Sequence, residues 1–403
     1  MAVVQKLNAV QVQKDFPFFR QGLIYLDSAA TSQKPRAVLN AVVGFYESNN
    51  ANVNRGMYQL AEKATAKYDE ARRIIAGFIG ARDDELIFVR NATEAINMVA
   101  QCFARNVVGA GDSVLVTEME HHSNILPWQR VAREKGGRLD VVPITERGVI
   151  EISALREKLA MRPKLFAFSH VSNVLGTVNP AKEFIAEAHK LKIPVLLDAS
   201  QSIPSMPIDV KGLDCDFLVF SGHKMLGPHI GVLYVKREFL ERMSPFLVGG
   251  GMVKEVTFES ATFKDGQEKF DAGTFDVPGA VGLAAAIDYL KKIGMENVQA
   301  HEEELARYAY DVLAKDPAIT VYGPRDRLNL VSFNVGDMHA HDVAAILDEA
   351  GICVRAGHHC AQPLMRRLGI PACVRASFGV YNTKEDVDAL IAAIGKAKKV
   401  FGI

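Results

Sequence analysis

The chain has 403 residues, enough for two or three domains, and 49% of them are apolar while 23% are charged, which is typical of a globular protein and excludes a disordered one. Its 47 basic residues balance 47 acidic ones, so the charge gives no reason to expect a nucleic acid or an anionic membrane as a partner. No apolar run reaches the roughly 18 residues that a membrane span needs, and residues 1–14 lack the pattern of a signal peptide, so we expect a cytoplasmic protein.

Short apolar strands alternate with helical segments over residues 86–236. Strands are expected at residues 86–90, 113–118, 138–144, 164–170, 195–200, 216–221 and 231–236. Helices are expected at residues 62–78, 93–107, 181–190 and 303–314. Several of the strands are almost wholly apolar, which is typical of a mainly parallel sheet with helices on both faces. This part of the chain is therefore expected to form an α/β domain.

The C-terminal part of the chain follows a different pattern. Two expected helices, at residues 342–349 and 384–400, flank two strand-like segments at residues 328–334 and 374–377. The change of pattern indicates a smaller α+β domain packed on the large α/β domain.

Polar side chains follow four of the expected strands, 113–118, 164–170, 195–200 and 216–221, at the point where each strand ends. They are Glu120, His121, His122, Ser123 and Asn124 after the first, Ser172 and Asn173 after the second, Asp198, Ser200 and Gln201 after the third, and Ser221, His223 and Lys224 after the fourth. Ligands bind beyond the carboxyl ends of the strands in such sheets, so these side chains should share one edge. No strand is followed by the glycine-rich motif of a dinucleotide or nucleoside triphosphate site, which disfavours the nucleotide-binding folds.

The pair Asp198 and Lys224 is the most informative of these residues. A buried lysine can lose its proton and form a Schiff base with a carbonyl group. Pyridoxal phosphate requires such a lysine together with an acid beside its pyridine nitrogen. An ordinary salt bridge is the alternative interpretation of the pair.

Residues around this pair are suited to the rest of the same cofactor. Thr93 lies at the start of an expected helix, where hydroxyl and amide groups bind phosphate, and Ser221 and His223 precede the lysine. Thr93 is also an ordinary helix-capping residue on the alternative interpretation. One of His121 and His122 is expected to stack on the cofactor ring.

The cysteines predict a single working thiol. They are Cys102, Cys215, Cys353, Cys360 and Cys373, an odd number without the spacing of a zinc knuckle or a redox dithiol. A thiol with a pKa near 8.5 is about 3% thiolate at pH 7, so a nucleophilic cysteine needs histidine or cationic neighbours. Cys360 follows His358 and His359 directly, whereas the other four have the apolar or strand-like surroundings of buried, inert cysteines. Three consecutive residues rarely bind one ion, so we expect no metal site.

Two arginines accompany this thiol. Arg355 precedes it by five residues, and Arg375 lies at the end of a short expected strand. Either arginine can form an ordinary ion pair, but Arg375 is well placed to bind a substrate carboxylate through two hydrogen bonds.

Taken together, these motifs resemble a known family. The chain is similar to the cysteine desulfurases of the pyridoxal-phosphate fold-type I group, among the relatives of the class V aminotransferases, and resembles their SUF-type (group II) branch. The matching motifs are Leu26-Asp27-Ser28-Ala29-Ala30-Thr31, Arg90-Asn91-Ala92-Thr93-Glu94, Glu120-His121-His122-Ser123-Asn124, His170-Val171-Ser172-Asn173, Asp198-Ala199-Ser200-Gln201, Ser221-Gly222-His223-Lys224, Arg355 to Cys360, and Arg375-Ala376-Ser377. The resemblance implies a large, mainly parallel-sheet domain over residues 21–280, and a small α+β domain, formed by residues 1–20 and 281–403, that carries the Cys360 loop.

The resemblance implies a role for each residue at the cofactor. Lys224 would bind pyridoxal 5′-phosphate as a Schiff base, and Asp198 would pair with the pyridine nitrogen. Gln201 would hydrogen-bond the ring oxygen, and His121 would stack on the ring. The phosphate ligands would be Thr93, Ser221 and His223, together with Thr274 from the neighbouring subunit of a homodimer.

The same resemblance implies the reaction. Asn173, Arg375 and Arg355 would bind the substrate, L-cysteine. Cys360 would attack the substrate sulfur and become a persulfide, leaving L-alanine, while Lys224 moves protons. The sulfur would then pass to an acceptor protein, for iron–sulfur cluster assembly or another use. Selenocysteine lyase, with L-selenocysteine as substrate, is the alternative; a kynureninase-like or aminotransferase-like enzyme and a non-catalytic sulfur-transfer scaffold are further ones.

Three segments depart from the family pattern. The turn over residues 225–231 after Lys224 is one residue shorter than usual, and Phe275-Asp276-Val277 replaces a common Pro-Asn-Ile/Thr. Asn54 and Tyr58 stand where histidines often flank the arginine that is Arg55 here. By resemblance these segments border the dimer interface and the substrate entrance, so they bear on substrate preference and partner docking.

Overall fold

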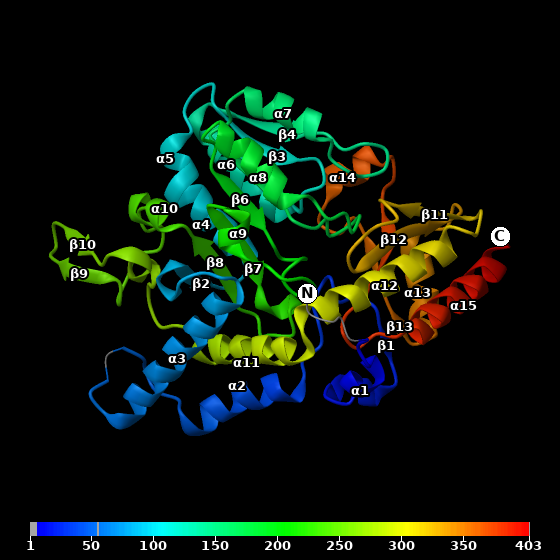
Figure 1. Cartoon of the computed structure of the whole chain (residues 1–403), viewed down its shortest axis with the longest axis horizontal. Coiled ribbons are helices and arrows are strands. Elements are labelled where there is room, and N and C mark those ends of the chain that lie inside the picture. The colour runs from blue at the N-terminus through cyan, green and yellow to red at the C-terminus, as the bar shows by residue number, and fades with distance from the viewer. Residues whose placement is uncertain (1–5, 55, 403) are drawn as a thin grey trace.

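The computed structural model describes residues 6–54 and 56–402 of the chain. Figure 1 shows a central sheet in cyan to green and a second sheet in orange beside it. The central sheet has seven strands in the order β2-β8-β7-β6-β5-β3-β4. These strands are β2 (Leu86–Val89), β3 (Ser113–Thr117), β4 (Arg138–Val142), β5 (Leu165–Ser169), β6 (Val195–Asp198), β7 (Phe217–Ser221) and β8 (Gly231–Val235).

The central sheet is mainly parallel, as predicted. Every residue of β3, β5 and β7 is buried, which explains why these strands are nearly continuous apolar runs. The exception is β8, which lies antiparallel between β2 and β7. The strand predicted over residues 195–200 ends at Asp198, because the Asp198 carboxylate accepts a hydrogen bond from the Ser200 N–H and the chain turns there.

Helices cover this sheet, and α2 and α3 both pack against α11 below it in Figure 1. The helices of this part are α2 (Arg36–Ser48), α3 (Gln59–Phe78), α4 (Ala92–Val99), α5 (Arg105–Val107), α6 (Leu126–Lys135), α7 (Ile152–Ala160), α8 (Ala181–Lys190), α9 (Val210–Leu213), α10 (Arg237–Arg242) and α11 (Val277–Ile293). The single helix predicted over residues 93–107 is interrupted, since a wider π-helical turn at Ala100–Ala104 joins α4 to α5 and buries Cys102 and Phe103.

The second sheet is antiparallel and has four strands in the order β11-β12-β15-β14. They are β11 (Ile319–Tyr322), β12 (Leu330–Val335), β14 (Arg355–Gly357) and β15 (Cys373–Ser377). The accompanying helices are α12 (Met295–Leu313), α13 (Ala340–Glu349), α14 (Gln362–Arg367) and α15 (Lys384–Phe401). The strands and helices α12, α13 and α15 share a separate apolar core that includes Leu305, Phe333, Val374 and Leu390, whereas Leu364 of α14 belongs to the core of the larger part.

The helix predicted over residues 303–314 is longer than expected. It begins at Met295, directly after Gly294, whose φ of +89° suits glycine and marks the turn out of α11. Met295 and Val298 in its first turns are buried, so packing on the core extends the helix beyond the segment with clear periodicity.

The N-terminal segment joins the C-terminal part of the chain. After α1 (Ala9–Gln13), the short strand β1 (Ile24–Tyr25) pairs in parallel with β13 (Ile352–Cys353), and Asp27 forms a bridge with Ser377. A hairpin of β9 (Val253–Val256) and β10 (Ala261–Phe263) extends from the other side of the molecule (Figure 1). The domain limits predicted at residues 20/21 and 280/281 stay predictions. No helix of the described residues combines the length and apolarity needed to cross a membrane.

Candidate active site

A cavity lies at the carboxyl ends of β3, β5, β6 and β7, where the loop after β14 and strand β15 approach them. Eleven of the twelve predicted site residues line this cavity: Thr93, His121, Asn173, Asp198, Gln201, Ser221, His223, Lys224, Arg355, Cys360 and Arg375. The sheet thus brings together residues that lie up to 282 positions apart, from Thr93 to Arg375. We call this space the central cavity.

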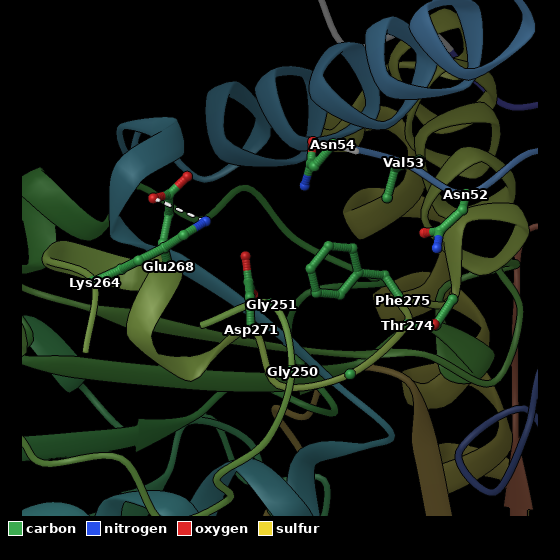
Figure 2. Close-up of a pocket in the computed structure, with 11 residues that line it drawn as sticks. Asn52, Val53, Asn54, Gly250, Gly251, Lys264, Glu268, Asp271, Thr274 and Phe275 are labelled. Atoms are coloured by element: carbon green, nitrogen blue, oxygen red, sulfur yellow. Dashed lines mark ion pairs between the residues drawn. The ribbon is translucent and has the colours of Figure 1, made fainter. Parts of the chain in front are cut away.

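Thr274 is the predicted site residue that the chain does not bring to the central cavity. It lines a separate cavity together with Asn54 and Phe275, and Figure 2 shows Phe275 projecting into it. Lys264 and Glu268 form an ion pair of 3.6 Å at its rim (Figure 2).

Two of the departures from the family pattern meet in this second cavity. Asn54 lies on one side of it, and the Phe275 ring stacks on Tyr68 with the ring centroids 5.2 Å apart. Tyr58 is exposed at the start of α3, and Arg55 lies outside the described residues. Asn54 and Phe275 therefore shape one surface feature that is distinct from the central cavity.

The buried position of Lys224 favours its neutral amine. Burial lowers the pKa of Lys224, the charge of Asp198 opposes this effect, and Arg375 adds to it. Asp198 is buried, and one carboxylate oxygen accepts a hydrogen bond of 2.9 Å from the Ser200 N–H. A neutral amine is the nucleophilic form, so this lysine can form a Schiff base.

His121 is neutral and held in place. Burial and, next, the Lys224 charge lower the pKa of His121 to about 3. Its Nδ1 accepts a hydrogen bond of 3.1 Å from the Ser123 N–H, which fixes the ring orientation at the wall of the central cavity. A neutral imidazole in this position can stack on an aromatic ring without charge repulsion from Lys224.

The start of α4 forms one end of the central cavity. Thr93 Oγ1 lies 2.7 Å from Ser123 Oγ, and the Ala92 N–H donates to Ser221 Oγ at 2.9 Å. Gly231 of β8 is necessary for this approach, because a Cβ there would lie 2.5 Å from the Asn91 Cα. Hydroxyl groups at a helix N-terminus provide a site for a phosphate group.

Four side chains of the central cavity carry a buried polar atom that has no partner among the described residues. These atoms are Gln201 Oε1, His223 Nδ1, His359 Nδ1 and Arg375 Nε. Buried polar groups are normally hydrogen-bonded, so these atoms indicate a polar ligand. A lysine, an acid, a neutral imidazole and a phosphate-binding end are the donor and acceptor set that pyridoxal 5′-phosphate requires, and the residues present fit this cofactor.

Arg375 is buried and held by two acceptors. Its guanidinium donates to the Asn173 carbonyl at 2.8 Å and to Asp27 Oδ1 at 3.2 Å. Asp27 also pairs with the exposed Arg355, at 3.6 Å. Burial raises the pKa of Asp27, and the two arginines oppose that rise. With Nε still free of a partner, Arg375 can bind a carboxylate.

Cys360 lines the central cavity from a loop of unusual conformation. His359 and Cys360 both have positive φ angles, +51° and +54°. The Cys360 N–H donates to His358 Nδ1 at 3.2 Å, and the His122 N–H donates to the Cys360 carbonyl at 2.7 Å. Cys360 is half-buried, whereas Cys102, Cys215 and Cys373 are buried. Cys353 was expected to be buried as well, but on the short strand β13 it is only half-buried.

The sequence predictions missed two participants, Asp27 and Ser123. Both belong to motifs quoted for the family resemblance, but neither received a role. Asp27 lies two positions after the short strand β1, which was not expected from the sequence, and its pairing with Arg375, 348 residues away, leaves no local signal.

Comparison with known proteins identifies the relatives of the chain. The aminotransferase class-V family matches residues 24–390. A probable cysteine desulfurase of Halalkalibacterium halodurans is 49% identical over 98% of this chain and 99% of its own length. A cysteine desulfurase of Haloferax volcanii is 46% identical over 94% of this chain and 90% of its own length.

Solved structures agree with this result. The apo structure of a cysteine desulfurase from Thermococcus onnurineus NA1 has a TM-score of 0.93 and 40% identity, covering 99% of this chain and 100% of that one. An Escherichia coli cysteine desulfurase in its S-sulfonic acid form has a TM-score of 0.92 and 39% identity, covering 98% of this chain and 100% of that one.

Proposed function

This chain belongs to the aminotransferase class-V family, whose members are pyridoxal-phosphate enzymes of fold type I, and we propose that it converts L-cysteine to L-alanine as a cysteine desulfurase. The observation that carries the proposal is that Lys224 and Cys360 line the same cavity as the buried Arg375. An amine for the cofactor, a cation for the substrate carboxylate and a thiol for the substrate sulfur are then within reach of one small amino acid. The predicted resemblance to the cysteine desulfurases and the predicted fold class are confirmed.

Pyridoxal 5′-phosphate is the cofactor, and when bound it supplies the electron sink that lets the Cα proton of an amino acid ionise. Lys224 would hold it covalently, and Asp198 would keep its pyridine nitrogen protonated. Gln201 would hydrogen-bond the ring oxygen, and His121 would cover one ring face. The phosphate would lie at the start of α4, bound by Thr93, Ser221 and His223.

The substrate carboxylate would bind to Arg375, with Asn173 beside it and Arg355 at the entrance. Asn173 Nδ2 donates to the His359 carbonyl at 2.8 Å, so this residue also holds the thiol loop against the substrate site. The neutral Lys224 amine, favoured by the lowered pKa, would take the proton from Cα.

Cys360 would perform the sulfur transfer as a thiolate. A sulfur–sulfur bond forms between Cys360 and the substrate sulfur while the carbon–sulfur bond breaks, and the bonding electrons stay with Cβ, which takes up a proton. The products are a persulfide on Cys360 and L-alanine. Atoms and electrons balance without an external oxidant or reductant.

The test combines two variants of the purified holoenzyme. We expect Lys224→Ala to lack the visible absorbance band that borohydride bleaches in the wild type. We expect Cys360→Ala to keep the band but to lose sulfide and alanine production from L-cysteine. Continued release from L-cysteine by Cys360→Ala would exclude the nucleophile role, and retained activity on L-selenocysteine alone would favour the selenocysteine lyase alternative.

We also propose that the enzyme works as a homodimer and passes its sulfur to an acceptor protein in the cytoplasm. Thr274 lies in the second cavity and not at the phosphate end of its own chain, which supports a contribution to the site of a second copy. Exposed apolar side chains on α2 and in the following segment, including Val43, Tyr46 and Met57, support a covered surface there. Light scattering of the holoenzyme tests this assembly, and a monomer would contradict it.

A further inference from the structure

The thiol loop adopts a backbone conformation that its residues do not favour. His359 and Cys360 are consecutive non-glycine residues with φ near +50°. This left-handed region is unfavourable for residues with a Cβ, and it persists only where surrounding contacts impose it. Contacts from outside the loop are therefore needed to keep the thiol in position.

His122 provides such contacts on both sides of Cys360. Its main-chain N–H donates to the Cys360 carbonyl at 2.7 Å, and its imidazole Nε2 accepts from the Gln362 N–H at 3.0 Å. Its ring also lies 5.7 Å from the ring of His358, whose Nδ1 accepts from the Cys360 N–H at 3.2 Å. His122, in the segment after β3, thus holds the loop that precedes α14 through both its main chain and its side chain.

The His122 side chain does not line the central cavity, in contrast to its neighbour His121. It is half-buried between its own segment and the thiol loop. Its contacts are with the protein, so it acts on the reaction only through the position of Cys360.

We propose that the His122 imidazole is a positioning residue for Cys360, holding the strained thiol loop by accepting the Gln362 main-chain hydrogen bond. This inference rests on the proposed function, since it assigns a purpose to the loop that carries the nucleophile. It also explains why two adjacent histidines follow β3: His121 lines the central cavity and His122 secures the thiol loop.

The hydrogen bond requires an unprotonated Nε2, so the contact is sensitive to acid. Burial and, next, the neighbouring His358 lower the pKa of His122, which keeps the acceptor form at neutral pH. His121 and His358 are the described titratable groups whose rings contact it. The hydrogen bond from the Gln362 N–H to His122 is fully formed above the ordinary histidine pKa of about 6.5. It is lost as the pH falls through the lower pKa that His122 has in the folded protein.

The experiment compares His122→Ala, His122→Gln and wild-type holoenzyme. Glutamine carries an amide oxygen that can replace Nε2 as an acceptor but does not titrate. His189→Ala, at the opposite edge of the sheet where His189 pairs with Asp214 and Asp216, is the matched control. The readouts are amide hydrogen exchange of the peptide over residues 357–367, the rate at which iodoacetamide alkylates Cys360, and kcat and KM for L-cysteine.

We expect His122→Ala to exchange faster in this peptide, to change the alkylation rate, and to lower kcat between about tenfold and about a hundredfold. KM should change by less than about twofold, because the carboxylate and cofactor groups are untouched. His122→Gln should restore protection and most of kcat, and His189→Ala should match the wild type. Below a pH of about 6.5 the loop of the wild type should lose protection relative to His122→Gln at the same pH.

Two results would overturn the proposal. One is unchanged exchange of residues 357–367 in His122→Ala; the other is a His122→Gln variant that behaves like His122→Ala. If His122→Ala does not fold, the pH comparison between the wild type and His122→Gln decides. Exchange and alkylation require no turnover, so a wild-type protein that makes no alanine would contradict the proposed function while leaving this test intact.

Discussion

At the scale of single residues, the central cavity depends on charges that are balanced inside the protein. Arg375 is buried, and Asp27 provides the carboxylate that compensates its charge. Asp27 occupies one Nη atom of Arg375, and the Asn173 carbonyl occupies the other. The guanidinium is thereby oriented, and its Nε remains available for a ligand.

We predict that Asp27→Asn lowers the free energy of unfolding by about 2 kcal/mol, because it leaves a buried guanidinium without its counter-charge. Urea denaturation of the holoenzyme, followed by fluorescence, measures this change. Asp326→Asn, which alters a highly exposed ion-pair partner, serves as control and should have no measurable effect. Equal stability of the two variants would show that Asp27 does not balance Arg375.

At the scale of secondary-structure elements, the phosphate end of the cavity depends on the close approach of β8 to the start of α4. Gly231 permits this approach, since its missing side chain leaves room for the Asn91 backbone. Asn91 caps α4 by accepting a hydrogen bond of 3.0 Å from the Glu94 N–H. A displacement of Asn91 would therefore change the helix end that carries Thr93.

We predict that Gly231→Ala destabilises the protein by about 1–3 kcal/mol through overpacking and weakens retention of pyridoxal 5′-phosphate. Equilibrium dialysis of the purified protein, read by its visible absorbance, measures the retention. The control is Gly395→Ala in α15, where no atom lies within 4 Å of the new Cβ; it should be neutral or slightly stabilising. Wild-type retention in Gly231→Ala would refute the role of this contact.

The elements also show which parts of the site the sequence could predict. Most of the polar residues expected after β3, β5, β6 and β7 line one cavity, because parallel strands align their carboxyl ends, whereas Glu120, His122, Asn124 and Ser172 do not line it. The antiparallel direction of β8 was not predicted, since an apolar strand reads the same in either direction. The pairing of Asp27 with Arg375 depends on contacts between distant segments, which no local pattern reveals.

At the scale of the whole molecule, a buried carboxyl group lies between the two sheets. Glu302 of α12 hydrogen-bonds with Ser205, which follows β6, and with Asn329, which precedes β12. Burial raises its pKa from 4.5 to about 8, so the folded protein binds this proton more tightly than the unfolded chain. The stabilisation that this group provides is complete below pH 4.5 and is lost as the pH rises through about 8.

We predict that Glu302→Gln reduces the decline in unfolding free energy between pH 5 and pH 8 by about 1–3 kcal/mol, because the amide does not titrate. Urea denaturation at several pH values measures the decline. Glu296→Gln, exposed on the same helix, is the control and should keep the wild-type profile. Identical profiles for the wild type and Glu302→Gln would contradict the prediction.

The parallel pairing of β1 with β13 has a consequence for synthesis of the protein. Residues 24 and 25 are translated more than three hundred positions before their partners at 352 and 353. Asp27 is likewise translated well before its partner Arg375, and Thr93 well before Cys360. A polypeptide that stops before residue 360 therefore lacks both the carboxylate-binding cation and the thiol, so reactive sulfur cannot be liberated until Arg375 has been translated.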